Sequence, residues 1–401
     1  MCDCLVAVGS AGTLFAKNSD RPVGEVQVLE THPRRSAGRA LATQYLTIAD
    51  RGAAPLLGSR PTWLWGLEHG VNEHRVAVGN EMLFTAEDPR AAPPALIGMD
   101  FVRLALERAT DADAAVTVIT ELLARHGQGG AGETDPPKAY FSSFLIADPH
   151  RAWIVETSGS TWAARSVGPG SGVALSNRIT LRDDWTLASP DVEPGADFDR
   201  YRRRDSPTGH ADRRLACTRP LVARGADHIS PADLVGVLRD HGGDRWGRPG
   251  DPVEPVVAPP AAEAEPPTGV TVCMHLRGNQ TTNAAMVTQL PVDPDAPVRA
   301  WVALGSPCSS VFVPVFPPLG VPPELARPEL YAAFDALRPP VEGPEGAEAL
   351  ARVRSVLGPL ERDLWQEAEA CATPGRHAAR DTFLAGIGDR LTGALRRIRM
   401  E

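Results

Sequence analysis

Short apolar runs separated by turn residues fill the first 180 residues, and this spacing limits the fold more than any other feature of the chain. Residues 4–9 and 13–17 lie on either side of a Ser-Ala-Gly turn, which predicts a β-hairpin at the start of the chain. Further runs have the length and composition of strands: 26–31, 76–80, 141–147, 152–157, 161–166 and 173–177. We therefore expect a strand-rich fold.

Helical periodicity appears once in the middle of this region. Residues 99–109 and 112–125 carry apolar side chains at helical spacing, with a break at Thr110 and Asp111 that predicts a helix cap. Ser230 followed by Pro231 is typical of another helix start. Strand-like runs then return at 269–276, 283–290 and 299–304.

The character of the chain changes after about residue 320, where helical stretches are predicted at 328–337, 345–371 and 376–399. The stretch 248–267 is rich in Pro, Ala and Glu, which predicts an exposed linker. No clear boundary precedes residue 320. We therefore expect one domain over 2–320 and a C-terminal helical extension over 321–401 that packs on it.

Charge and composition exclude several classes of function. A net charge of -9 and a pI of about 5.6 argue against nucleic acid as the main partner, because binding to phosphates needs a basic surface. The sequence has no apolar run of about 18 residues and no signal-peptide pattern, so no membrane association is expected. Its six cysteines are scattered through the chain, which favours a reducing cytoplasm over a disulfide framework.

Motifs for other chemistries are absent or out of place. There is no Gly-x-Ser-x-Gly elbow, P-loop or His-Glu-x-x-His. Gly127, Gly129 and Gly132 satisfy Gly-x-Gly-x-x-Gly, but they follow a predicted helix, which favours a helix cap over dinucleotide binding. Cys2 and Cys4 are spaced like half of a metal site, yet no second Cys/His pair accompanies them. We therefore expect no metal and no organic cofactor.

Cys2 directly follows the initiator methionine, whose removal a small second residue usually permits. The product would carry a thiol with a pKa of about 8.5 and an α-amine with a pKa of about 7.7–8.0 on the same residue. At cytoplasmic pH part of that amine is neutral and can take the thiol proton, so nucleophile and base are pre-positioned. From this dipeptide alone, an ordinary strand residue is the favoured alternative.

Several segments in the correct order resemble secernins and related C69 peptidases. Cys2-Asp3-Cys4, the apolar strand, the turn and the segment at 15–21 are similar to the family's N-terminus. The family's Arg-Pro-x-Trp-x-Trp-Gly, Gly-x-Asn-Glu-x-Gly and Gly-Asn-Glu elements also have counterparts, although Arg75 stands where the last residue of the second element is often Gly. The matching later segments are 60–66, 70–74, 79–81, 96–100, 126–130, 143–148 and 153–157. Similarity is dense over 2–180 and thinner to about 315.

The resemblance implies an α+β fold of the N-terminal nucleophile hydrolase kind, a four-layer αββα sandwich. It also implies a cysteine-dependent amidohydrolase of the dipeptidase or N-acyl amino acid amidase type, with a small peptide or amide as substrate. Two alternatives stay open: an acyltransferase that uses the same Cys2 thioester, and a non-catalytic binding protein. A homo-oligomer is also left open.

The resemblance carries catalytic roles to particular residues. Asp20 matches an aspartate that holds the terminal amine, and Lys17 or Arg21 would supply a positive charge that lowers the thiol pKa. A solvated turn with a surface ion pair is the alternative for this segment. An arginine that faces the nucleophile in the wider superfamily matches Arg213 or, one residue later, Arg214, with a helix-surface arginine as the alternative.

Asn80 and Asn177 are the candidates for an oxyanion hole, because a side-chain amide at a strand end can donate to developing negative charge. Turn-capping asparagines are the alternative for both. In the family-like segments, Asn18, Trp65 and Glu81 are the candidates for substrate binding.

Overall fold

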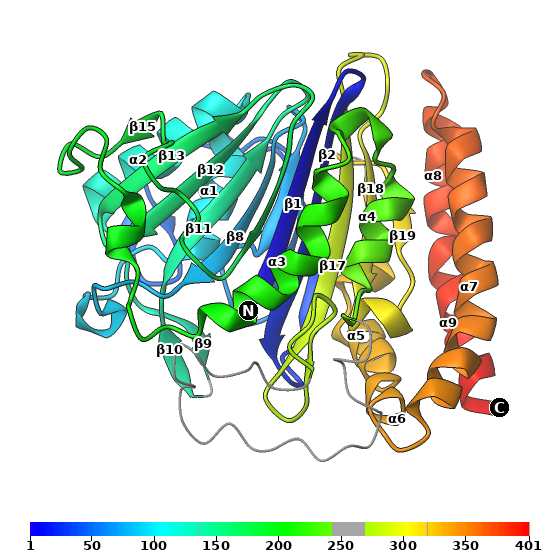
Figure 1. Ribbon diagram of the computed structural model, residues 1–401. Helices are drawn as coiled ribbons and strands as arrows, with labels where there is room; N and C mark the ends of the chain where they lie inside the picture. Colours follow the sequence, from blue (N-terminus) through cyan, green and yellow to red (C-terminus); the bar gives the residue numbers. More distant parts are fainter. Residues whose placement is uncertain (135, 243–268, 319, 401) are drawn as a thin grey trace.

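The structure is a computed structural model that describes residues 1–134, 136–242, 269–318 and 320–400 (Figure 1). Two antiparallel sheets pack face to face, and helices cover their outer faces. This layering is the αββα sandwich of the α+β class that the sequence analysis expects. The predicted linker at 248–267 lies outside the described residues.

The first sheet carries Cys2 at one end of its strand β1, and we call it the Cys2 sheet. Its strand order is β14 (Gly172–Ser176), β1 (Cys2–Gly9), β2 (Gly12–Pro22), β17 (Gln280–Pro291), β18 (Arg299–Leu304) and β19 (Val313–Val315), with β16 (His275–Leu276) paired to β17. The hairpin predicted from the first residues is β1 and β2, which sit in the middle of this sheet.

The second sheet faces the Cys2 sheet. Its strand order is β15 (Leu187–Ala188), β13 (Thr161–Val167), β12 (Ala152–Ser158), β11 (Phe141–Ala147), β8 (Ala77–Leu83), β7 (His69–Asn72), β6 (Leu56–Pro61) and β3 (Gln27–His32). Two small ribbons pair β4 (Leu41–Ala42) with β5 (Thr47–Ile48), and β9 (Ala131–Thr134) with β10 (Pro137–Ala139).

Two pairs of helices form the outer layers. The second sheet is covered by α1 (Gly98–Arg108) and α2 (Ala112–His126), and the Cys2 sheet by α3 (Thr208–Val222) and α4 (Pro231–Leu238). Caps set their starts: Asp111 accepts a hydrogen bond from the N–H of Ala114, and Ser230 forms a capping box with Asp233. Both helix starts confirm the sequence prediction.

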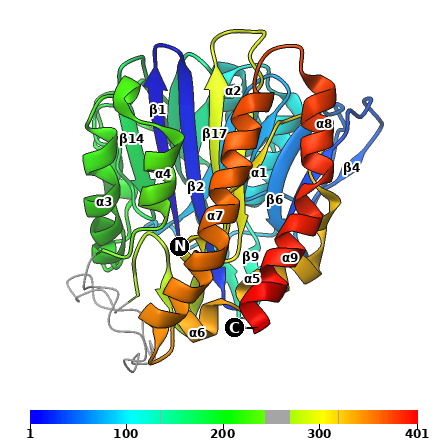
Figure 2. The same ribbon diagram turned by 90° about the vertical axis from the view of Figure 1, so that its right-hand side faces the viewer.

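The C-terminal helices lie beside the β17–β19 side of the Cys2 sheet (Figure 2). They are α5 (Pro328–Asp335), α6 (Arg338–Val341), α7 (Gly346–Cys371), α8 (His377–Ala385) and α9 (Ile387–Met400). The predicted stretch at 376–399 is two helices with a break at Gly386. Among the helices of the described residues, none has both the length and the apolar character that a membrane span requires.

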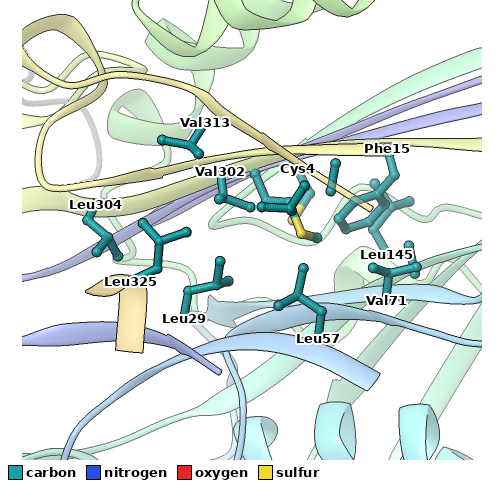
Figure 3. Close-up of a cluster of buried hydrophobic side chains, with 14 of the residues drawn as sticks. Cys4, Phe15, Leu29, Leu57, Val71, Leu145, Val302, Leu304, Val313 and Leu325 are labelled. Carbon is teal, nitrogen blue, oxygen red and sulfur yellow. The ribbon is translucent and has the colours of Figure 1, made fainter. Parts of the chain in front are cut away.

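Strand alternation separates the apolar side chains that lie between the sheets from those that pack against the outer helices. On β1, Cys4, Val6 and Val8 point between the sheets, whereas Leu5 and Ala7 point toward α3 and α4. Figure 3 shows the inter-sheet core, where side chains of the first sheet meet those of the second. Side chains of the C-terminal helices, such as Leu357 and Leu391, belong to the same buried cluster.

One predicted strand is mostly irregular. Of residues 269–276, only His275 and Leu276 form strand β16. The carbonyl of Gly269 instead accepts hydrogen bonds from the N–H groups of Thr271 and His275, which folds this segment into a tight loop. The apolar composition of the segment is explained by its burial rather than by strand pairing, and a short apolar run does not distinguish the two.

Gly66 fixes how closely α1 approaches the second sheet. A Cβ atom at Gly66 would lie 2.3 Å from the carbonyl carbon of Met99, which is backbone and cannot rotate away. We predict that Gly66→Ala lowers the free energy of unfolding in urea by about 1–3 kcal/mol, as overpacking does. The control is Gly236→Ala on the exposed side of α4, where no atom lies within 4 Å of the added Cβ. It should raise stability by up to about 1 kcal/mol. Equal changes in the free energy of unfolding in the two variants would contradict the close packing of Gly66 against α1.

Candidate active site

Cys2 begins β1 in the interior of the protein, with 6% of its surface exposed. The register places it opposite Ser19 of β2. Its N–H donates to Oδ1 of Asn177 at 2.8 Å, and its carbonyl oxygen accepts from Nη1 of Arg214 at 2.7 Å. Both polar groups of the Cys2 backbone are therefore held by side chains that come from other parts of the chain.

Arg214 of α3 is the centre of this arrangement. Its guanidinium is fully buried and forms an ion pair with Asp3 at 2.8 Å, and Oδ2 of Asp20 lies 3.6 Å away. Its Nη2 also donates to Oδ1 of Asn177 at 2.6 Å. The sequence did not decide which of two adjacent arginines faces the nucleophile, and Arg213 was the first candidate. The structure assigns these contacts to Arg214, because the helix turns the half-buried Arg213 to a different side.

Asp20 is aimed by an irregularity in the neighbouring strand. The β2–β17 register shifts between Thr282 and Ala284, a β-bulge that places Thr282 directly opposite Asp20. Oγ1 of Thr282 donates to Oδ1 of Asp20 at 2.6 Å, while Oδ2 faces Arg214. Burial raises the pKa of Asp20, and the nearby α-ammonium group and Arg214 oppose that shift.

Met1 covers the start of β1. Its ammonium group donates to the carbonyl oxygen of Asp20 at 3.2 Å and to Oε1 of Gln280 at 2.9 Å. Burial lowers the pKa of this amine. The Met1 side chain belongs to a small apolar cluster with Val270, Met274 and Leu276. Met1 thus occupies an apolar space that adjoins Cys2.

Lys17 supplies a positive charge on the same inner face as Cys2. It lies opposite Cys4 in the hairpin, and its Nζ is 3.8 Å from Glu68. Burial would lower the pKa of Lys17, but the thiols of Cys2 and Cys4 and the nearby carboxylates raise it above its usual value. Burial raises the pKa of the Cys2 thiol, and Lys17 is the strongest opposing influence.

Arg21, the other candidate for that charge, is committed to different partners. It binds Glu25 at 2.5 Å and Glu68 at 3.2 Å, and it donates to the carbonyl oxygen of Gly132 at 2.6 Å. Its Nη1 also lies 3.3 Å from the hydroxyl of Tyr140. Glu68 therefore links Lys17 to Arg21, and Lys17 is the cation placed to act on Cys2.

The two candidate oxyanion donors differ in placement. Asn177 contacts the Cys2 N–H through Oδ1, and its Nδ2 donates to the carbonyl oxygen of Met82 at 2.9 Å. Asn80 lies on the α1 side of β8, and its Nδ2 contacts the sulfur of Met99 at 3.3 Å. This geometry favours Asn177 as a group that orients the Cys2 nitrogen, and it argues against a direct contact between the side chain of Asn80 and a group bound to Cys2.

The three candidates for substrate binding are also engaged elsewhere. Asn18 donates to the carbonyl oxygens of Leu238 and Val272 at 2.9 and 2.8 Å, so it ties β2 to the layer above the Cys2 sheet. Glu81 is buried beside Cys4 and Lys17, and burial raises its pKa to about 8. Trp65 stacks on the guanidinium of Arg103 at 4.2 Å, at the α1 side of the second sheet. These placements argue for structural roles.

Gln280, Thr282 and Glu68 belong to the site, but no sequence motif marks them. Gln280 and Thr282 are more than 250 residues from Met1 and Asp20, which they contact, and only the β2–β17 pairing brings them there. Glu68 precedes the family-like segment at 70–74. Only its burial between two cations, which the structure shows, distinguishes it. No local signal identifies such residues.

A cavity of about 440 Å³ adjoins the site. Met82 and Tyr140 line it, and these residues contact Asn177 and Arg21, respectively. Its wall carries both signs of charge: Arg90 is paired with Asp88, Arg203 with Asp205, and Lys138 with Glu133. The cavity thus places open space two contacts away from the Cys2 nitrogen.

No protein-family model matches the chain. It is similar at 13% identity to a solved variant of the conjugated bile acid hydrolase of Clostridium perfringens, over 75% of this chain and 88% of that one, with a TM-score of 0.42. It is also similar at 12% identity to the Caenorhabditis elegans ortholog of N-acylethanolamine-hydrolyzing acid amidase, over 73% and 94% of the two chains, with a TM-score of 0.40. A third similar structure is penicillin V acylase from Agrobacterium tumefaciens, at 12% identity, 79% and 86% coverage and a TM-score of 0.39. At these sequence identities and TM-scores the similar structures assign no role to any residue of this chain, and the description of the site depends on its own geometry.

We predict that Arg214→Met lowers the free energy of unfolding by about 3–5 kcal/mol, because it leaves Asp3 and Asp20 buried without their cation. Arg213→Met, the adjacent control, should change it by less than about 1 kcal/mol. Urea unfolding monitored by tryptophan fluorescence measures both. A larger loss in the Arg213 variant would mean that the wrong arginine has been placed beside Cys2.

Proposed function

We propose that this protein is a cysteine-dependent amidohydrolase in which Cys2, freed of Met1, is the N-terminal nucleophile. One observation carries the proposal: the backbone nitrogen of Cys2 is held by Asn177 beside the Arg214–Asp20 pair, where a free α-amine would find acceptors for its hydrogens. The finer assignment, also proposed, is a dipeptidase or N-acyl amino acid amidase of the secernin kind.

The proposed reaction begins with transfer of the thiol proton to the neutral α-amine of Cys2. The thiolate then attacks the amide carbonyl carbon and forms a tetrahedral oxyanion. The α-ammonium returns its proton to the leaving nitrogen, the C–N bond breaks, and a thioester remains on Sγ. Water gives a proton to the same amine and attacks the thioester carbon; the C–S bond then breaks, the α-ammonium returns its proton to the thiolate, and the carboxylic acid is released.

The surrounding residues prepare this proton transfer. The positive charge of Lys17 lowers the pKa of the Cys2 thiol against the effect of burial. Asp20 and Asn177 offer acceptor oxygens that orient the amine, and Arg214 holds both of these acceptors in place. An oxyanion role for the Nδ2 group of Asn177 would require it to exchange its hydrogen bond with Met82.

The position of Met1 supports an apolar group in the substrate. Loss of Met1 would free the space between Val270, Met274 and Leu276, next to the nucleophile. An apolar acyl group or side chain gains by filling such a space, whereas a charged one loses hydration there.

Two other functions use the same residues. An acyltransferase would pass the acyl group from the Cys2 thioester to an amine instead of water, and a binding protein would hold the ligand without forming a thioester. The proposed hydrolase agrees in reaction class with the hydrolases and the acylase named among the similar structures.

Hydrolysis can be tested with a panel of dipeptides and N-acyl amino acids, followed by mass spectrometry of the products. We expect release of the acid and the amine by the wild-type protein, with apolar acyl groups favoured over acidic ones. Cys2→Ala should lose at least 10³-fold in rate, on the order of the loss when a catalytic nucleophile is removed. The matched control Cys4→Ser, one inward-facing residue further along β1, should stay within about tenfold of wild type.

Added amines separate hydrolysis from acyl transfer. Products in which the amine carries the acyl group would favour the acyltransferase. Equal activity of wild type and Cys2→Ala on every substrate would overturn a nucleophilic role for Cys2.

A further inference from the structure

Two cysteines and two histidines converge at a second site that plays no part in the proposed amide chemistry. His241 follows α4, Cys273 lies in the loop that leads into β16, His275 is the first residue of β16, and Cys308 lies in a 3₁₀ turn at Pro307–Ser309. One ligand atom from each residue lies within 4.8 Å of every other. His241 is half-buried and the other three residues are buried.

Two nitrogen–sulfur separations agree with a tetrahedral metal site. Nε2 of His275 lies 3.5 Å from Sγ of Cys273 and 3.4 Å from Sγ of Cys308. In tetrahedral zinc, with Zn–S near 2.3 Å and Zn–N near 2.0–2.1 Å, a sulfur and a nitrogen ligand stand about 3.6 Å apart. Both nitrogen–sulfur separations are therefore close to those around one zinc ion, and the remaining separations among the four ligand atoms are within 4.8 Å.

The surroundings of His275 select the nitrogen that would bind the metal. Nδ1 of His275 lies 2.9 Å from Oε1 of Glu342, and the other carboxylate oxygen of Glu342 accepts from Arg338 at 2.9 Å. A carboxylate on one ring nitrogen fixes the tautomer in which the other nitrogen carries the lone pair. Nε2, which faces both sulfurs, is then the metal ligand.

We propose that His241, Cys273, His275 and Cys308 bind one zinc ion as a closed structural site. Two Cys and two His ligands are a common set for structural zinc, and the four together leave no open position for catalysis. Two buried thiolates would be neutralised by the divalent ion, which removes the cost of burying their charge.

Hydrogen bonds are the alternative explanation for this cluster, because Nε2 of His275 also lies within hydrogen-bond distance of Sγ of Cys273 and Sγ of Cys308. This alternative predicts a protein that carries no metal and whose two thiols respond equally with and without a chelator.

The proposed zinc site would stabilise the loop that contacts the candidate active site. The carbonyl oxygen of Val272, next to Cys273, accepts from Asn18 at 2.8 Å. The N–H of Met274 donates to Oγ1 of Thr282 at 2.9 Å, and Thr282 in turn holds Asp20. Fixing Cys273 and His275 on a metal would therefore fix the loop that positions Asp20.

Sequence alone predicted no metal, because Cys2 and Cys4 have no accompanying Cys/His pair and no standard zinc signature occurs; that prediction did not consider Cys273 and His275. Their partners lie about 30 residues away on each side, in segments without a zinc-binding spacing. Only the fold brings His241 and Cys308 to the loop.

Zinc content measured on the purified full chain by elemental analysis tests the site. We expect one zinc per chain in the wild type, and less than about one-tenth of that in Cys308→Ser and in His275→Gln. Cys217→Ser is the matched control, because Cys217 is a half-buried cysteine of α3 outside the cluster. It should keep the full equivalent.

A second measurement uses only the wild type, in case the variants do not fold. Zinc should protect Cys273 and Cys308 from alkylation, and a strong chelator should expose both. Replacement by cobalt should give the intense visible bands of a tetrahedral ion and the sulfur-to-cobalt charge-transfer band. Zinc-free wild type that takes up no zinc on dialysis, with no protection of these two thiols, would overturn the site whatever the activity of Cys2.

Discussion

The burial of Arg214 is the constraint on which the rest of the site depends. A guanidinium without solvent must be matched by negative charge and by acceptors, or the fold loses several kcal/mol. Here the match consists of Asp3, the Cys2 carbonyl oxygen and Asn177, with Asp20 close by. The charge of Arg214 thus determines where the first residues of β1 and the end of β14 must lie.

Strand geometry determines the positions of the other residues of the site. The alternation of β1 sends the side chains of Cys2 and Cys4 between the sheets and that of Asp3 toward α3, so the nucleophile and the ion pair lie on opposite faces of one strand. The bulge at Asn283 brings Thr282 opposite Asp20. Pairing of β1 with β2 places Lys17 on the same face as the thiol. A few local irregularities in a regular sheet therefore produce the site.

The local parts of this arrangement could be predicted from the sequence, and the long-range parts could not. The β1–β2 hairpin and the α1–α2 pair follow from apolar spacing and turn residues, and Cys2, Lys17 and Asp20 lie within that hairpin. Arg214 could not be separated from Arg213, because helix rotation relative to the sheet is a tertiary property. Thr282, Gln280 and the partners of Cys273 and His275 depend on contacts across tens to hundreds of residues. Asn18 and Glu81 were expected to meet a substrate, but their alternation on the strands buries them against the protein itself.

The central claim is that Cys2 carries a free α-amine and an activated thiol. The most direct test is the intact mass of the purified protein, before and after a substrate-like electrophile that acylates thiols, followed by sequencing of the N-terminal peptide. The account predicts a mass lower than that of the full chain by one methionine and a single adduct on the first residue, Cys2. Full retention of Met1, or an adduct that persists unchanged in Cys2→Ala, would contradict it, because Cys2 would then have no amine to take its proton.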